Sequence, residues 1–149
     1  MKKTFLSSLL AVMGLLLLGC GGNTPVAPVS ERIAKIWTAG KVEANTTTVY
    51  TKGQTQPANI EPRYASFRLN LNSSGTVQYT EFDGNTFTGN WTATDTRLTL
   101  TGLVPQPTGT SGTIEFAIGT LTDTQLVLTR TTASQKTGGT TNKYTLSNP

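Results

Sequence analysis

Apolar and polar residues alternate along most of the chain after position 66, which is the period of a β-strand with one buried face. Seven short runs show this alternation, at 67–71, 77–79, 87–93, 98–100, 114–118, 126–128 and 144–146. Turn-forming residues separate the runs. Asp83-Gly84-Asn85, between the second and third runs, is a signal for a tight hairpin because Asp-Gly tolerates a positive φ. The pattern therefore predicts a series of short strands joined by turns.

The segment ahead of these runs is less regular. Residues 36–51 form either one long bent strand or a hairpin that turns near Asn45. Residues 52–65 contain two prolines and no strand pattern, so we expect a long loop there. Ser30 is a candidate N-cap for a short helical turn before the first strand. With 36–51 taken as one strand, the chain has eight strands.

The connections between these strands indicate how they pair. They are too short for a crossover helix, so neighbouring strands must be antiparallel. Residues 92–101 and 120–129 share the pattern T-x-T-D-T-x-L-x-L-T, which fits the turn and return strand of two hairpins. Asp95 and Asp123 are expected to hydrogen-bond their own turn backbone. We predict an all-β fold, a small eight-stranded antiparallel up-and-down barrel, because closure removes the free sheet edges; an open β-sandwich is the alternative.

Composition and charge agree with a β-rich domain. About a fifth of the residues are threonine, which is β-branched and favours strands, and only 13% are charged. The formal net charge of +4 falls to +2 once Lys2 and Lys3 of the N-terminal leader are set aside. The sequence has no run of lysine or arginine, so we expect no nucleic-acid partner.

The beginning of the chain has the layout of a bacterial lipoprotein signal. Lys2 and Lys3 precede an apolar stretch at 5–18, which is shorter than the roughly 20 residues of a transmembrane span. The sequence "LLGC" at 17–20 resembles a lipobox. The resemblance implies diacylglycerol on the Cys20 sulfur, cleavage before Cys20 by signal peptidase II, and acylation of the new amine. Several acyl chains would anchor the protein stably, because one chain alone binds a membrane only marginally.

These features divide the chain into three parts and suggest where it resides. We predict a signal peptide at 1–19, a lipidated Gly- and Pro-containing tether at 20–32, and the β-barrel domain at 33–149. Gly21 follows the cysteine where an aspartate would indicate retention at the inner membrane. The sorting pattern of Gram-negative lipoproteins thus implies the outer membrane, with the periplasmic or surface face left open.

Side chains that carry chemistry are scarce. The sequence has no histidine, which acyl-transfer triads and most general-base sites use. Cys20 is the only cysteine, so it cannot form a disulfide within the chain or complete a metal site. The eight carboxylates are scattered and lack the spacing of a calcium loop. We therefore predict no catalytic residues, no metal and no cofactor, and we expect a protein that is not an enzyme.

Four aromatic residues on the inward face are the candidate ligand-binding residues. By the strand register, Tyr79, Phe87, Trp91 and Phe116 all point into the barrel. They would line an apolar pocket for a small hydrophobic ligand, or they would simply fill the core. The hydroxyl of Tyr79 and the indole N–H of Trp91 each need a polar partner when buried, which favours a pocket slightly.

Taken together, the motifs resemble the bacterial lipocalin-like domain of small lipoproteins. The shared features are Trp37 at the start of the first strand, F-x-L-x-L-x-x-x-G-T at 67–76, G-x-W at 89–91 and the T-D-T-x-L-x-L returns. The resemblance extends over 36–147 and implies a barrel with the 52–65 loop as a lid at its open mouth. It also implies binding of a small apolar ligand. A filled barrel that serves as a structural or protein-interaction module of the envelope is the alternative.

The sequence departs from the lipocalin pattern at two places. Lipocalins place Gly-x-Trp on the first strand, whereas Lys35 stands at the glycine position here. They also pack an arginine of the last strand over that tryptophan, and the last strand here offers Lys143 instead. Arg130, on the preceding strand, shares the inward parity of Leu126 and Leu128. It is therefore the candidate to stack on a tryptophan at one end of the barrel.

Overall fold

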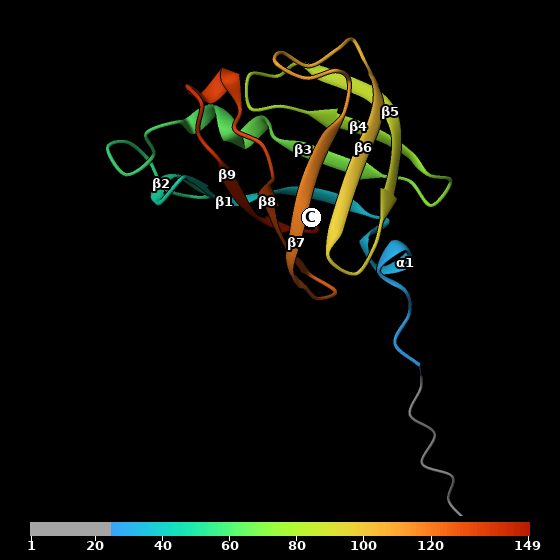
Figure 1. The fold of residues 1–149 in the computed structure, drawn as a ribbon. Coiled ribbons are helices and arrows are strands. Elements are labelled where there is room, and N and C mark those ends of the chain that lie inside the picture. Colours follow the sequence, from blue (N-terminus) through green and yellow to red (C-terminus); the bar gives the residue numbers. More distant parts are fainter. Residues whose placement is uncertain (1–24) are drawn as a thin grey trace, which may run out of the picture.

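The computed structural model describes residues 25–149, which form one antiparallel β-sheet with three short helical segments (Figure 1). The strands are β1 (Ile36–Ala44), β2 (Thr47–Thr51), β3 (Arg68–Leu71), β4 (Thr76–Thr80), β5 (Thr86–Ala93), β6 (Arg97–Val104), β7 (Ile114–Leu121), β8 (Gln125–Arg130) and β9 (Asn142–Ser147). The helical segments are α1 (Val29–Ile33), η1 (Pro62–Ser66) and η2 (Gln135–Thr137). The sheet order is β2-β1-β3-β4-β5-β6-β7-β8-β9, with β9 also paired to β1.

The β1–β9 pairing closes the sheet into a barrel. β9 pairs with β1 from Thr38 to Ala44, while the other edge of β1 pairs first with β3 and then, from Lys41 onward, with β2. Eight strands therefore form the closed barrel and β2 is an additional strand beside β1. This confirms the predicted all-β eight-stranded antiparallel barrel. The open sandwich is not adopted, because a closed barrel leaves no unpaired central edge.

Residues 36–51 form the hairpin of β1 and β2, which is the second of the two predicted arrangements. The turn lies at Asn45, which has a positive φ of 53°. Asparagine accepts this left-handed conformation better than most residues. The turn is also tied to the start of β9, because Asn45 N donates to the Thr141 carbonyl and Asn45 Oδ1 accepts from Thr141 N.

The barrel interior is filled by apolar side chains from every strand. Their alternation with exposed residues gives the burial expected for strands with one inward face. Where β5 and β6 approach most closely, Gly89 sits at a register shift, and a Cβ there would lie only 2.5 Å from the Thr101 carbonyl oxygen. Gly89 therefore marks close packing of the backbone.

The two ends of the barrel are covered differently (Figure 1). At one end α1 packs through Ile33, whose carbonyl accepts a hydrogen bond from Trp37 Nε1 at 2.9 Å. The helix begins at Val29 after Pro28 and has no side-chain cap, so the expectation that Ser30 caps it is wrong. The fixed φ of Pro28 suits the start of a helix and removes one position for a capping side chain. At the other end, which we call the mouth, lie the 52–61 loop, η1 and η2.

The hairpin turns follow the sequence signals with one exception. Gly84 has a φ of +84° and Asp83 Oδ1 accepts from Asn85 N, as expected for the Asp-Gly turn. In the two repeated turns, however, the hydroxyls of Thr94 and Thr122 accept the backbone N–H bonds that we had expected Asp95 and Asp123 to accept. In each turn the accepting threonine lies one residue before the aspartate and three residues before the donor, which is Arg97 N in one turn and Gln125 N in the other. The aspartates remain at the exposed tips of the turns.

Candidate functional site

A cavity of about 220 Å³ lies at the mouth of the barrel. The side chains that enclose it include Val49, Ile60, Arg63, Tyr64, Phe82 and Lys136. They come from β2, from the loop and η1 that follow it, from the β4–β5 turn and from η2. The 52–65 segment therefore contributes a wall of this cavity, as the lipocalin resemblance implied. The volume is smaller than the 300–1,000 Å³ of a typical pocket for a drug-sized ligand.

The rim of the cavity carries a paired arginine. Both guanidinium contacts of Arg63, from Nε and Nη2, reach the Glu61 carboxylate at 2.7 Å, and the guanidinium also lies 5.0 Å from the centre of the Phe82 ring. Hydrogen bonding to Arg63 lowers the pKa of Glu61 and in turn raises the pKa of Arg63. The positive charge at the rim is thus already neutralised by a neighbour.

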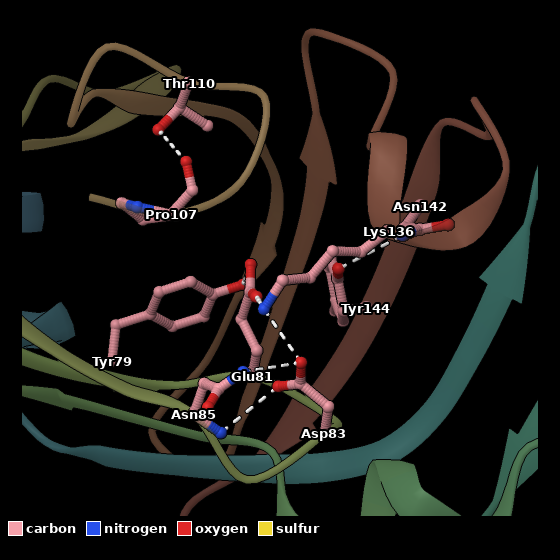
Figure 2. A network of polar contacts seen from close by, with 9 residues as sticks. All are labelled: Tyr79, Glu81, Asp83, Asn85, Pro107, Thr110, Lys136, Asn142 and Tyr144. Carbon is pink, nitrogen blue, oxygen red and sulfur yellow. Dashed lines mark hydrogen bonds and ion pairs between the residues drawn. The ribbon is translucent and has the colours of Figure 1, made fainter. Parts of the chain in front are cut away.

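A lysine bridges two elements across the mouth (Figure 2). Lys136 Nζ, on η2, lies 2.5 Å from Glu81 Oε2 and 2.8 Å from Asp83 Oδ2, both next to the β4–β5 turn. Burial alone would lower the pKa of Lys136 and raise that of Asp83. Their mutual hydrogen bond, with further contributions from Glu81 and Asn85, reverses both directions, so that the pKa of Lys136 is raised and that of Asp83 is lowered. We call this set of three charged residues the mouth bridge.

Beneath the cavity lies a buried group of polar side chains that we call the tyrosine–arginine cluster: Tyr64, Tyr79, Tyr144, Glu81 and Arg130. None is more than 5% exposed. Tyr79 Oη donates to Glu81 Oε1 at 3.5 Å, and the rings of Tyr64 and Tyr144 lie 6.3 Å apart. Burial raises the pKa of Tyr144 to about 12 and raises those of Tyr64 and Tyr79 as well, while the positive charge of Arg130 opposes the shift in all three.

Among residues 25–149, three atoms of this cluster are buried without a hydrogen-bond partner, and two of these also lack an ion-pair partner. These two are the hydroxyl of Tyr64 and Nε of Arg130. Glu81 Oε2 makes no hydrogen bond by strict geometry either, but its ion pair with Lys136 compensates it. A buried donor without a partner carries its full desolvation cost, so these two groups stand out from the rest of the interior.

Arg130 does not stack on a tryptophan, contrary to our expectation. Gln125, the first residue of β8, pairs with Ser147 of β9, and Ser147 also pairs with Thr38 of β1 near the α1 end. β8 therefore begins at the α1 end and runs toward the mouth. Arg130, the last residue of β8, therefore lies at the mouth, whereas Trp37 lies at the α1 end. The cation over Trp37 is Lys35, at 5.8 Å from the ring centre. The inward side of Arg130 was predicted correctly, since only 3% of the residue is exposed.

Comparison with known proteins identifies the fold to which this barrel is similar. A scan against protein-family models finds no match, and a search of curated proteins finds no similar sequence. Among solved structures, the chain is similar to a lipocalin-like protein from Bacteroides uniformis ATCC 8492, with a TM-score of 0.50 and 16% sequence identity over 79% of this chain and 99% of that chain. The domain has a lipocalin-like fold.

A second solved structure gives a weaker match to the lipocalin-like domain. It is an uncharacterized protein from Bacteroides eggerthii DSM 20697, with a TM-score of 0.43 and 15% identity over 78% of this chain and 98% of that chain. At sequence identities this low, a structural similarity is evidence for the fold alone. Any ligand must be inferred from the side chains of this chain.

The lipocalin-like barrel brings two of the four candidate aromatic residues into contact and links a third to them through the rings of Tyr144 and Phe67. Tyr79 and Phe87 have ring centres 5.9 Å apart, and Phe116 packs edge-on against Tyr144 at 6.1 Å. Trp91 lies toward the α1 end, where its Nε1 donates to the Asn72 carbonyl and it lines a different, open cavity beside α1. All four are buried, as their inward register predicted. Whether they contact a ligand stays a prediction.

Two residues of the mouth, Tyr64 and Lys136, were not singled out by the sequence. Tyr64 lies in a segment without strand period, so no register argument applies to it. Lys136 meets Glu81 only because η2 folds back over the β4–β5 turn, 55 positions away in the chain, and nothing in the local pattern signals this contact. The one signal of a buried polar cluster in the sequence is that Arg130, a charged residue, falls on the inward-facing side of its strand.

Within residues 25–149, no group of three or more His, Cys, Asp or Glu side chains is arranged to hold a metal ion. The same part of the chain contains no helix long and apolar enough to cross a membrane. The predicted signal peptide at 1–19, the lipid attachment residue Cys20 and the first part of the tether lie outside the described residues.

Proposed function

We propose that this protein is a lipid-anchored envelope lipoprotein whose lipocalin-like domain binds a small ligand at the mouth of the barrel. The observation that carries the proposal is the mouth cavity, which is enclosed by Val49, Ile60 and Phe82 and floored by Tyr64. A pocket with mostly apolar walls and a few polar groups at one point is the usual form of a small-molecule site. The protein needs no catalytic group for this role.

The location of the site differs from the one that the strand register alone suggested. The deep interior around Phe67 is occupied, because its ring stacks on Tyr144 at 4.7 Å and meets Tyr79 edge-on at 5.7 Å. A ligand therefore enters at the mouth, with Tyr79, Phe87 and Phe116 as the next layer below. Trp91 would belong to this site only if the ligand spanned the whole barrel.

The membrane part of the proposal rests on the lipobox-like sequence around Cys20. Acyl chains on Cys20 would hold the domain at the outer membrane, and the segment up to α1 would serve as the spacer. Metabolic labelling with palmitate tests this directly. We expect label on the wild-type chain and none on Cys20→Ser; label that persists on the variant would exclude Cys20 as the attachment site.

A second candidate function is a filled barrel that acts as an interaction module of the envelope. The close ring contacts of the interior and the small volume of the mouth cavity favour this alternative. Native mass spectrometry of the full chain, purified from its own envelope, separates the two. A reproducible additional mass of a few hundred daltons is the expected result. Its consistent absence, with the lipid-modified chain itself detected, would favour the interaction module.

A further inference from the structure

The positive charge of Arg130 is buried without a direct counter-ion. The residue is 3% exposed, and none of the ion pairs among residues 25–149 includes it. The nearest candidate in the cluster, Glu81, is held by Lys136 instead. A buried charge that lacks a contacting partner is costly, so its retention at this place calls for a group that it binds.

A second unsatisfied donor belongs to the same place. The Tyr64 hydroxyl is buried and has no partner, although the ring of Tyr64 forms part of the cavity wall. Arg130 pairs with Phe116 across β7 and β8, and the ring of Phe116 lies 6.1 Å from that of Tyr144. The Tyr144 ring in turn lies 6.3 Å from the ring of Tyr64, whereas Arg130 does not line the cavity itself. Tyr64 is therefore the member of the tyrosine–arginine cluster that lines the cavity, and Arg130 lies in the layer beneath it.

The other cations of the mouth do not share this property. Arg63 is paired with Glu61, and Lys136 is paired with two carboxylates. Of the charged side chains in the tyrosine–arginine cluster and on the cavity wall, Arg130 is the cation without an ion-pair partner among residues 25–149. An anion that entered the mouth would thus find the one cation without an ion-pair partner in the buried cluster that Tyr64 connects to the cavity wall.

We propose, building on the ligand-binding function above, that the ligand is a small amphipathic carboxylate whose anionic group is bound by Arg130 and Tyr64. A carboxylate has only acceptor atoms and matches the planar fork of a guanidinium, and its remaining lone pair accepts from the Tyr64 hydroxyl. The apolar part of the ligand lies against Val49, Ile60 and Phe82. Binding requires the Tyr64 side chain to rotate aside, so that the carboxylate reaches Arg130.

The test compares two probes that share one ring system and differ in the polar group: the anionic 2-naphthoate and the neutral 2-naphthalenemethanol. Each is titrated by calorimetry into the full lipidated chain in a nonionic detergent, with the heat of the detergent alone subtracted. We expect naphthoate to bind at least about tenfold more tightly than the alcohol, since hydrogen bonds to charged groups are the stronger kind. Arg130→Gln should remove this preference while leaving the affinity for the alcohol within about twofold.

Two further variants keep the test decisive if Arg130→Gln does not fold. Tyr64→Phe keeps the ring but deletes the hydroxyl, and it should weaken naphthoate several-fold without affecting the alcohol. Arg63→Gln tests the rival anion site on the rim, because it removes a guanidinium of the cavity wall that is already paired with Glu61. It should leave the preference for naphthoate over the alcohol unchanged.

The outcomes separate the inference from the function beneath it. Equal binding of both probes, unaffected by Tyr64→Phe and by Arg130→Gln, would overturn the carboxylate assignment while the ligand site at the mouth stands. If Arg63→Gln abolished naphthoate binding and Tyr64→Phe did not weaken it, the assignment to Arg130 and Tyr64 would be overturned, and the carboxylate would be placed at Arg63 on the rim. If neither probe binds the wild-type chain at millimolar concentration, both the inference and the proposed ligand site fail.

Discussion

Lys136 Nζ lies 2.5 Å from Glu81 Oε2, and this contact joins η2 to the end of β4 across the mouth of the barrel. Both side chains are largely buried, at 15% and 6% exposure. The segment between β8 and β9 is thereby fixed over the same opening that the 52–61 loop and η1 border (Figure 1). The bridge makes the shape of the mouth depend on a long-range ion pair.

Removal of the lysine from this bridge should destabilise the protein strongly. Lys136→Met leaves Glu81 buried without its partner, and loss of one member of a buried pair costs about 3 kcal/mol or more. Urea denaturation at pH 7 measures this loss. The double variant with Glu81→Gln should recover a large part of it, because the more deeply buried carboxylate is no longer charged and the remaining one, Asp83, is 23% exposed.

A matched control is Lys41→Met. Lys41 pairs with Glu43 at 3.0 Å, but its side chain is 42% exposed, so its removal should change the free energy of unfolding by less than about 1 kcal/mol. If Lys136→Met and Lys41→Met cost the same small amount, the mouth bridge does not hold the fold as we describe.

Stability should depend on pH at both extremes. The pKa of Asp83 is lowered in the folded state, so its contribution is present at neutral pH and is lost as the pH falls from its unfolded value toward its lower folded value. The pKa of Tyr144 is raised to about 12, so the unfolded state ionises first and stability is lost as the pH rises from about 10 toward 12. Urea midpoints measured across pH show both limbs. In Lys136→Met the acid limb should be shallower, and an unchanged acid limb would contradict the role of the bridge in lowering the pKa of Asp83.

The hydroxyls of two buried tyrosines should differ in their contribution to stability. Tyr64→Phe removes a buried hydroxyl without a partner, so its free energy of unfolding should be unchanged or raised. Tyr144→Phe leaves Asn142 Nδ2 without the hydroxyl it donates to at 3.4 Å, and should cost about 1 kcal/mol. Denaturation of the two variants side by side measures the contrast. A larger loss in Tyr64→Phe would mean that its hydroxyl has a partner in solution.

The close approach of β5 and β6 should make Gly89 intolerant of any side chain. A methyl group there meets the Thr101 backbone carbonyl, and overpacking of this kind costs about 1–3 kcal/mol. Gly119→Ala is the control, since a Cβ at that position lies 3.4 Å from the side chain of Val127 and should cost under about 1 kcal/mol. Equal thermal midpoints for Gly89→Ala and the wild type would contradict the observed packing.

The strand pattern was sufficient to predict the barrel, because period-2 alternation and short connections leave few ways to pair the strands. It placed Tyr79, Phe87, Trp91 and Phe116 inside, and their burial agrees. The details that failed depend on competition between neighbours. The turn hydroxyls of Thr94 and Thr122 took the bonds assigned to the following aspartates, for example.

The mouth could be predicted only in outline. A proline-containing loop gives no register, so the position of Tyr64 over the cluster was not accessible from the sequence. The direction of Arg130 followed from parity, but the end of the barrel at which it lies depends on the direction of β8 relative to β1. That direction becomes known only when the closure between β1 and β9 is known.

Ligand carriage at the mouth is the central claim, and native mass spectrometry of two matched variants tests it most directly. Ile60 and Val104 are both exposed apolar residues, at 62% and 67%, but only Ile60 lines the mouth cavity. We predict that the full chain carries an additional mass that is lost in Ile60→Trp, where the indole fills the entrance, and kept in Val104→Trp. An additional mass that survives in Ile60→Trp and disappears in Val104→Trp would place the ligand on the outer wall and contradict the account.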